Sequence, residues 1–511
     1  MGLVERGTMI TPTPFDRPMY WPELVETLQS LLENTDVYLV GGIIRDVYLR
    51  RPVHDLDLAT PGDGRPVARR IANALQGDYY ALDAGRGVGR AIVNWQDKRW
   101  TIDVAQFRRD DLLGDLKDRD FTANAVAAHL HDLDKALDPL GGLEDIRNRL
   151  VRLCDPASIA NDPVRALRAV RLSLSHGMRL TPQTKQAIRH DGPTITAVSP
   201  ERLRDAFFRL LAGPKVMAGI MLLDALDLLP FLLPETLDMK AVTQSPPHIF
   251  DVWRHTMAVL AALEAIREIT LDVRQRDEAA ANFGLGMIAF ALAHLRGNLQ
   301  THLEYQWPSE RPHHALLFLA ALAHDTGKPP TRSVDEAGQV HFYRHEEYSA
   351  DIAARWGANL ALSNDEIERL HKIVRHHMRP QHLERSGMSR RALYRYWRDL
   401  GAAGVDICLL AMADVHGKYG PRLPQEPWLA LVQTIQRLLD GYYQEHETLV
   451  QFTPLLDGNQ LMRHLDLQPG PIVGRILAAL REAQALQEIR TSAEALNWAK
   501  SWLENHKGQA H

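Results

Sequence analysis

Hydrophobic and polar positions alternate in the first part of the chain and follow a helical period in the rest. The segments VYLVGG (37–42), DLDLAT (55–60) and WTIDVAQF (100–107) have the alternation of half-buried strands, and the first of them runs into a tight turn. After about residue 150 the apolar positions take helical spacing, as in RALRAVRLSL, HHALLFLAALAH and GRILAALREAQAL. The pattern predicts an α+β protein with a small mixed sheet in the head and a long all-α remainder.

Breaks rich in proline and glycine divide the helical part, and 511 residues are too many for one compact domain. We expect four parts, with boundaries at 1–150 for the head, 151–235 for a helical neck, 236–420 for a helical body and 421–511 for a helical tail. The most apolar stretch, NFGLGMIAFALAHL at 282–295, is short and carries Asn and His, so it predicts a buried helix rather than a membrane span.

The composition indicates in which cellular compartment the protein works. Hydrophobic residues make up 45% and charged residues 24%, which is ordinary for a soluble globular protein. Two cysteines, Cys154 and Cys408, cannot form a disulfide framework, and the N-terminus has polar residues where a signal peptide has an apolar run. We therefore expect a cytoplasmic protein with no membrane partner.

Charge is uneven along the chain. The net charge of −5 argues mildly against a nucleic-acid partner, but seven arginines lie between residues 147 and 179, and a second basic stretch covers 372–398. Both stretches could face phosphates, and both could equally be solvated helical faces.

A candidate metal site lies in the head. Asp55 and Asp57 are two apart on a predicted strand, so both carboxylates point to one face and suit magnesium. Gly41 and Gly42 follow a strand, where the missing Cβ lets backbone amides approach a triphosphate, and Arg45 can pair with phosphate oxygens. Asp103 could be a third carboxylate on a neighbouring strand, or only an edge-strand charge.

Two further segments offer nucleotide contacts. In DRDFTANAVA, Arg119 and Asn124 can donate to phosphate and sugar, although a capped helix would use the same residues. In NDPVRALRAVRLS, Asp162 is a candidate N-cap, and Asp162, Arg165 and Arg168 are three apart and cluster on one side. An Asp beside an Arg can read the edge of a base; a capped helix with a salt bridge is the alternative.

The body contains a second candidate metal site. His255, the adjacent pair His324-Asp325, and Asp414 are the ligands of an imidazole-and-carboxylate site. With Gly327-Lys328 following, this pattern resembles the HD phosphohydrolase superfamily. His345 and the pair His376-His377 could join a second metal or bind phosphate, or be exposed polar positions.

The order and spacing of GGIIRD, DLDL, RDFTANA, DPLGGLEDI and DPVRALRAVR resemble the class II CCA-adding enzyme and bacterial poly(A) polymerase family, within the DNA polymerase beta superfamily. The resemblance covers about residues 36–235 and implies a DNA polymerase beta-like nucleotidyltransferase head. It implies that Asp55 and Asp57 bind Mg²⁺ and are catalytic. It also implies a nucleotide-binding set, in which Gly42 and Arg45 bind the triphosphate and Arg119, Arg165 and Arg168 hold the incoming nucleotide. In that family Asp162 and Arg165 would select the base in place of a nucleic-acid template.

Two positions depart from the family pattern. The residue before Asp162 is usually Glu and here is Asn161, which loses a charge that could orient Arg165. The family also carries a flexible loop of a dozen or more residues before the arginine motif, whereas only residues 109–118 intervene here. In lacking this loop, the chain resembles enzymes that add CC only and leave the final A to a separate A-adding enzyme.

The resemblance implies transfer of C and/or A from CTP and/or ATP to the 3′ end of a tRNA. The tail, with Gly470-Pro471 opening a helix, resembles that of HD-containing CCA-adding enzymes and would bind tRNA, or would be a packing helix pair. The rivals are a poly(A) polymerase, a phosphohydrolase that uses its head only to bind RNA, and a non-catalytic RNA-binding protein. The activity and the divalent metal of the HD domain stay open.

Overall fold

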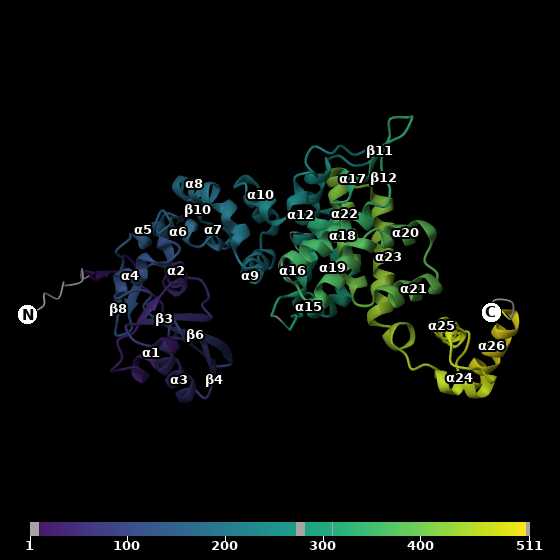
Figure 1. Ribbon diagram of the computed structural model, residues 1–511, viewed down its shortest axis with the longest axis horizontal. Helices are drawn as coiled ribbons and strands as arrows, with labels where there is room; N and C mark the ends of the chain where they lie inside the picture. Colours follow the sequence, from purple (N-terminus) through teal and green to yellow (C-terminus); the bar gives the residue numbers. More distant parts are fainter. Residues whose placement is uncertain (1–9, 272–281, 309, 507–511) are drawn as a thin grey trace, which may run out of the picture. The chain divides into compact units, whose positions relative to one another are not determined.

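A computed structural model describes residues 10–271, 282–308 and 310–506 (Figure 1). It divides into two compact units. One contains the residues up to Ala206 together with Ala218–Leu232, and the other contains Phe207–Met217 and the residues from Leu233 onward. The expected four-part division is finer than this and stays a prediction.

The first unit is built on an eight-stranded sheet of order β1-β8-β7-β2-β3-β6-β5-β4. The strands are β1 Thr13–Pro14, β2 Tyr38–Val40, β3 Asp55–Thr60, β4 Asp78–Asp83, β5 Val88–Trp95, β6 Lys98–Gln106, β7 Ala127–His129 and β8 Asp132–Leu137. All neighbours are antiparallel except β3 and β6, which are parallel. The three strands expected from alternation are therefore present, and they lie side by side at the centre of the sheet.

Each face of the sheet has its own apolar cluster. Leu56 and Leu58 of β3 point into the larger core, which α1 (Glu23–Leu31) and α3 (Gly64–Ala74) help to close. Ala59 belongs to a smaller cluster on the other face, where Leu116 of α4 (Leu112–Lys117) packs. Because successive side chains alternate, Asp55 and Asp57 lie on that second face and are exposed.

Short helices and a helical neck complete this unit. The head adds α2 Gly42–Tyr48, the 3-10 turn η1 Thr122–Asn124 and α5 Gly142–Arg147. The neck contains β9 Leu150–Val151, α6 Ser158–Asn161, α7 Val164–His176, β10 Arg179–Leu180, α8 Pro182–Asp191, η2 Gly192–Ala197, α9 Pro200–Leu211, α10 Val216–Ala225, α11 Leu229–Leu232 and η3 Pro234–Thr236. Of these, η3, the end of α9 and the start of α10 belong to the second unit. The segment after Arg119 forms η1 and then β7, so its interpretation as a capped helix is wrong.

The second unit is helical. It contains α12 Val252–Leu271, α14 Phe283–Ala291, η4 Ala293–Leu295, α15 Arg296–Glu304, α16 His313–Ala323, α17 Lys328–Thr331, α18 His345–Asn359, α19 Asn364–His376, α20 Arg379–Ser386, α21 Arg390–Leu400, α22 Ala403–Tyr419, η5 Gly420–Arg422 and α23 Gln425–Tyr443, with a small hairpin of β11 Arg332–Val334 and β12 Val340–Phe342. Helix α16 is apolar all round and is buried along its length, as the central helix of a bundle should be. Helices α12 and α22 approach closely at Gly417, which has no Cβ; a Cβ there would lie 2.8 Å from the backbone nitrogen of Val259.

The apolar stretch at 282–295 forms a helix that is only partly buried. Helix α14 buries Gly284, Ile288 and Ala291, but Phe290 is 81% exposed, so the interpretation as a buried helix is wrong for one face. Among the described residues no single helix is long and apolar enough to cross a membrane. One bent pair, Arg390–Leu400 with Ala403–Arg422 at 109°, passes that test by length and composition alone.

The tail has a core of its own. After η6 His446–Val450 it forms α24 Gly458–Leu465, α25 Pro471–Ala485 and α26 Ser492–Asn505. Leu461, Ile476 and Ala495 are among the buried residues of their shared cluster. Helix α25 begins at Pro471 directly after Gly470, as the sequence predicts.

Candidate functional sites

Two neighbouring strands bring three carboxylates together in the head. Asp55 and Asp57 are exposed on one face of β3, and the parallel register of β3 and β6 sets Asp103 opposite Asp57. Strand β6 has β5 on its other side, so the edge-strand interpretation of Asp103 is wrong. Arg90 of β5 donates to both oxygens of Asp103 at 2.7 and 2.8 Å. Asp103 is thus neutralised by a neighbour, whereas Asp55 and Asp57 stay open to solvent.

The electrostatics of Asp57 fit a bound cation. Its side chain reaches solvent, yet crowding by surrounding protein atoms raises its pKa above the ordinary value. The negative charges of Asp103 and Asp55 raise the pKa further, against the opposing effect of Arg119 and Arg45. Oxygen ligands with excess negative charge are what a hard divalent cation prefers. The donor set on this face therefore suits Mg²⁺.

The turn after β2 depends on Gly41 more than on Gly42. Gly41 has φ +79°, and a Cβ there would lie 2.9 Å from Oδ2 of Asp57 and 3.2 Å from Nη1 of Arg119. Gly42 is the first residue of α2, where a Cβ would lie 3.2 Å from Nη2 of Arg45. The two glycines thus make room for the Asp57 carboxylate and for two arginines. Gly41 is therefore part of the site together with the predicted Gly42.

Arg45 is held in a fixed orientation by a buried network. Its Nε and Nη2 donate to the carboxylate of Asp46 at 3.0 and 2.8 Å, and its Nη1 donates to Oδ1 of Asn124 at 2.5 Å. The Asn124 amide donates in turn to Asp120 at 3.0 Å, and Arg168 pairs with the other oxygen of Asp120 at 2.7 Å. Two of the predicted nucleotide-binding arginines, Arg45 and Arg168, are therefore linked through the Asn124 amide and the Asp120 carboxylate.

Asp120 stays ionised within this network. Burial alone would raise the pKa of its carboxyl, but Arg168, the Asn124 amide and the backbone N–H of Phe121 hold that pKa below the ordinary value. Arg168 therefore faces a permanent negative charge.

Arg119 has a buried partner of its own. Its Nε and Nη2 donate to Oδ2 of Asp115 at 3.0 and 2.8 Å, and Asp115 is almost fully buried in α4. The backbone N–H of Arg108 donates to the other oxygen of Asp115 at 3.1 Å. The spacing of four between Asp115 and Arg119 on a helical segment is the signal that could have found this pair.

The predicted base-reading residues lie where α6 meets α7. Asp162 does not cap α7, so that expectation is wrong; its carboxylate accepts from Nη2 of Arg202 at 3.0 and 2.9 Å. Arg165 donates to Oγ of Ser158 at 2.7 Å and to the carbonyl of Asp118 at 2.9 Å, and its Nε lies 4.0 Å from Asp162. Two neutral hydrogen-bond partners and the more distant Asp162 carboxylate thus orient Arg165.

In the body the four predicted ligands converge. His255 comes from α12, His324-Asp325 ends α16, and Asp414 comes from α22. Nε2 of His255 lies 3.1 Å from Asp414 and 3.4 Å from Asp325, and Nε2 of His324 lies 3.2 Å from Asp325. The His-Asp pair lies at a helix end rather than within a helix.

The same carboxylate faces a second group of ligands. Asp325, His345 and His377 offer atoms that all lie within 4.8 Å of one another, as do His255, His324 and Asp325. Nδ1 of His324, His345 and His377 lies near a backbone carbonyl, at 2.8, 2.9 and 2.8 Å, so each Nε2 is left for the centre. His376 does not belong to either group.

Burial favours the neutral, metal-binding form of most of these imidazoles; at His324 burial is outweighed by the charge of Asp325, which raises the pKa of that ring. Desolvation lowers the pKa of His377 to about 3 and also lowers the pKa of His255, so both rings are neutral at physiological pH. Among the described residues both ring nitrogens of His255 and Nε2 of His324 are buried without a hydrogen-bond partner. Unpartnered buried imidazole nitrogens are costly unless something binds them, and a divalent metal would do so.

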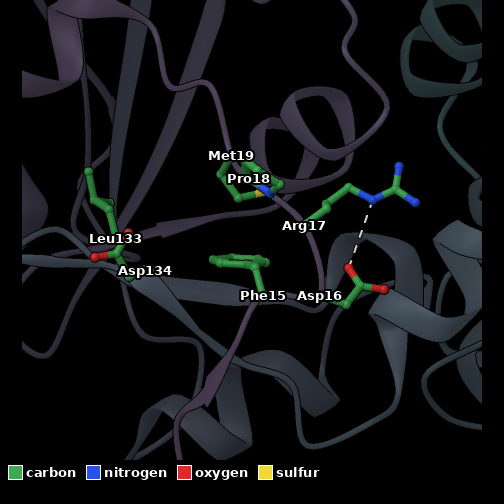
Figure 2. Close-up of a pocket in the computed structure, with 7 residues that line it drawn as sticks. All are labelled: Phe15, Asp16, Arg17, Pro18, Met19, Leu133 and Asp134. Atoms are coloured by element: carbon green, nitrogen blue, oxygen red, sulfur yellow. Dashed lines mark ion pairs between the residues drawn. The ribbon is translucent and has the colours of Figure 1, made fainter.

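Two other features lie outside these sites. A hollow of about 380 Å³ beside β8 is lined by Phe15, Asp16, Arg17, Pro18, Met19, Leu133 and Asp134 (Figure 2); it contains none of the predicted site residues. Part of the second basic stretch is paired within the chain, because Glu482 of the tail lies within 3.0 Å of Arg391 and 2.9 Å of Arg395. Its interpretation as a phosphate-binding face stays a prediction.

The head geometry is that of a metal-dependent nucleotidyl-transfer enzyme, and the comparisons agree. The family model for the poly A polymerase head domain matches residues 37–152, that for a probable RNA and SrmB-binding site of polymerase A matches 177–239, and that for the HD domain matches 286–412.

Several relatives match nearly the whole chain. The A-adding tRNA nucleotidyltransferase of Deinococcus radiodurans is 30% identical, covering 92% of this chain and 96% of the relative. The CC-adding tRNA nucleotidyltransferase of Thermus thermophilus is also 30% identical, covering 93% and 95%. Among solved structures, a complex of a CCA-adding enzyme with ATP has a TM-score of 0.57 at 18% identity, covering 95% of this chain and 96% of the other. At that identity the likeness concerns the fold.

This chain belongs to the tRNA nucleotidyltransferase family. It is a nucleotidyltransferase with an HD domain.

Proposed function

We propose that this enzyme adds the two cytidines, and not the terminal adenosine, to the 3′ end of tRNA. The observation that carries the proposal is the connection from β6 to Arg119. Strand β6 ends at Gln106, and α4 (Leu112–Lys117) takes up about half of the connecting segment. Asp111 caps this helix through Gly114, and Asp115 anchors Arg119.

A connection tied down in this way leaves no length for the flexible loop whose absence resembles CC-adding enzymes. The CC-adding relative from Thermus thermophilus supports the same conclusion. The equally similar A-adding relative from Deinococcus radiodurans favours a second candidate, addition of A alone to a tRNA that already ends in CC.

The reaction joins the RNA 3′-oxygen to the α-phosphorus of CTP and breaks the bond from that phosphorus to the bridging oxygen, so that pyrophosphate leaves. Asp55 and Asp57 would hold Mg²⁺, which lowers the pKa of the attacking hydroxyl and neutralises charge on the leaving group. The residues themselves contribute mainly by positioning, as is general for phosphoryl and nucleotidyl transfer.

The roles of the other head residues follow from their contacts. Arg45 and Arg119 would bind phosphate oxygens, each held in place by a carboxylate, and the Gly41-Gly42 turn would let backbone amides approach. Asp162 and Arg165 would read the base, one accepting and one donating. Arg168 forms an ion pair with Asp120, which belongs to the network that holds Arg45, and Arg168 would thereby change the electrostatic potential at Arg45.

The experiment uses tRNAs ending at the discriminator base, at C and at CC, each incubated with CTP or ATP and sized to one nucleotide. CC addition predicts that CTP extends the first by two nucleotides and the second by one, and that ATP does not extend the third. Efficient AMP addition to the CC-ending tRNA, without CMP addition, would favour the second candidate. Addition of many successive AMP residues to an unrelated RNA would favour a poly(A) polymerase. Binding without turnover would favour a non-catalytic protein.

We further propose that the HD domain binds divalent metal and hydrolyses phosphate esters. The support is the convergence of His255, His324, Asp325 and Asp414, with His345 and His377 facing the same carboxylate. Metal analysis of the purified protein tests this: Asp325→Ala should lose transition metal and phosphatase activity and keep CMP transfer. The opposite pattern, with Asp325→Ala abolishing the main activity and Asp55→Ala sparing it, would make the protein a phosphohydrolase with an RNA-binding head.

Two finer points belong to the same proposal. If the enzyme adds CC alone, a separate A-adding enzyme completes the tRNA end in the same cell. The proposed location is the cytoplasm, because tRNA, CTP and reduced cysteines occur together there.

A further inference from the structure

His176 lies at the end of α7, beside the residues that hold Arg45. Its Nε2 lies 2.9 Å from Oδ1 of Asp46, and its Nδ1 lies 2.7 Å from Oγ of Ser175. Asp46 is the residue whose carboxylate binds two nitrogens of Arg45. A histidine 130 positions away in sequence therefore contacts the acid that orients a predicted triphosphate ligand.

The protonation of this histidine follows from its surroundings. Burial lowers the pKa of His176, the nearby charges of Arg45 and Arg51 lower it further, and Asp46 opposes them; the net shift is downward. The ring is therefore neutral at physiological pH. An ionised carboxylate only accepts, so Nε2 carries the hydrogen and donates to Asp46, while Nδ1 accepts from the Ser175 hydroxyl.

The backbone at this helix end is fixed independently. Arg51 donates to the carbonyl of Ser175 and Arg149 donates to the carbonyl of His176, both at 2.8 Å. Both interactions satisfy carbonyls that a helix end otherwise leaves without partners. With its main chain held and both ring nitrogens engaged, His176 presents its N–H to Asp46 in one orientation.

The donors of Arg45 show what this arrangement does. A guanidinium has five N–H groups, and Asp46 and Asn124 accept from three of those of Arg45, so among the described residues two are left for phosphate oxygens. The two remaining N–H groups would point toward the phosphate oxygens only while the Asp46 carboxylate stays in place. Asp46 is partly exposed, with a side-chain exposure of 22%, so water competes for its oxygens once the histidine donor is lost.

We propose that His176 is a positioning residue for nucleotide binding, which fixes Asp46 and through it the phosphate-binding orientation of Arg45. A chain of hydrogen bonds then runs from His176 through Asp46, Arg45 and Asn124 to Asp120, and Asp120 forms an ion pair with Arg168. His176 and Arg168 both lie on α7, the helix that also carries Arg165. This role rests on the proposed nucleotidyl transfer in the head.

The test compares two amides of different reach. In His176→Gln the side-chain N–H lies near the position of Nε2 and can still donate to Asp46. In His176→Asn the amide reaches only as far as Nδ1 and cannot. The matched control is His190→Ala, which removes an exposed histidine paired with Asp191 at 2.7 Å on α8.

Steady-state CMP incorporation should separate these variants. We expect His176→Asn to raise KM for CTP roughly tenfold with little change in kcat, because a lost hydrogen bond to a charged group weakens ground-state and transition-state binding alike. His176→Gln and His190→Ala should stay near wild type. Equal KM values for the Gln and Asn variants would overturn the proposal, since a merely structural histidine would not distinguish them.

Two measurements keep the outcomes distinct. If His176→Asn melts at a lower temperature, a CTP titration well below its Tm, followed by intrinsic fluorescence, provides the same comparison. If the wild-type enzyme transfers no nucleotide to any tRNA, the proposed function fails, whereas active variants with identical KM values refute the role of His176 alone.

Discussion

Substituting Gly41 by alanine should damage the metal site through a single methyl group. The new Cβ would lie 2.9 Å from Oδ2 of Asp57, whereas ordinary contact begins near 3.4 Å. The carboxylate must therefore withdraw by about 0.5 Å, because such short contacts are strongly repulsive. Sites of this kind need their groups held to about 0.5 Å, and a 1 Å error costs on the order of 100-fold in rate.

We expect Gly41→Ala to lower kcat for CMP incorporation by about 10- to 100-fold, which corresponds to about 1.4–2.7 kcal/mol in the barrier. The assay is single-nucleotide extension of tRNA at saturating CTP, repeated over a range of magnesium concentrations. The optimum should move to higher magnesium, because the displaced Asp57 binds the ion less well.

Backbone strain needs a separate control, which the chain offers in Gly401. Gly401 has φ +53° and ψ −141°, close to the φ +79° and ψ −137° of Gly41, and a Cβ there would meet nothing within 4 Å. Gly401→Ala should therefore show the strain alone, about 1–3 kcal/mol of stability, with activity unchanged. If Gly41→Ala keeps the activity of Gly401→Ala, the contact with Asp57 has no catalytic consequence and the reasoning is refuted.

Three other predictions concern charged groups. Arg202→Ala should raise UMP misincorporation relative to CMP roughly tenfold, because Asp162 loses a charge-assisted partner; an unchanged ratio in a competition assay would contradict this. Burial raises the pKa of Asp406, but Arg369 and His302 lower it to about 2, so the stabilisation it provides, about 2 kcal/mol, is complete above pH 4 and lost as pH falls toward 2. Urea denaturation across that window should show the loss, and Asp406→Asn should flatten it. Glu482→Gln should weaken tail docking by about 1 kcal/mol, less in high salt, and limited proteolysis that releases the tail no faster than in wild type would count against it.

Much of the head was predictable because its signals are local. Period-two alternation placed Asp55 and Asp57 on one face of a strand, and the glycine turn before α2 placed Arg45 at a helix start. The acids that hold the arginines were harder to find. Asp46 and Asp115 are near their arginines in sequence, but surface carboxylates are often near arginines too, and the burial of Asp115 is visible only in the structure.

Long-range partners left no trace in the sequence. Nothing about Arg202 or His176 in isolation indicates that each binds an acid 40 or 130 positions away. Asp162 was expected to cap a helix, and tertiary pairing with Arg202 took its carboxylate instead. The same competition acts in the basic stretch at 372–398, where Glu482 of the tail pairs with two arginines that composition alone leaves open to phosphate or to solvent. Phe290 shows the converse, since apolarity predicts burial only if a neighbouring element covers that face.

The two candidate metal centres differ in the chemistry of their ligands. The one in the head offers carboxylate oxygens, whereas the one in the body is rich in imidazole nitrogen. Abundant magnesium suits the first, and scarce transition ions bind the second more tightly by the Irving–Williams order. If the HD domain has the hydrolytic activity proposed above, a cell starved of transition metal should lose that activity and keep its capacity to rebuild tRNA ends, so that metal supply would change the balance of two reactions of one polypeptide.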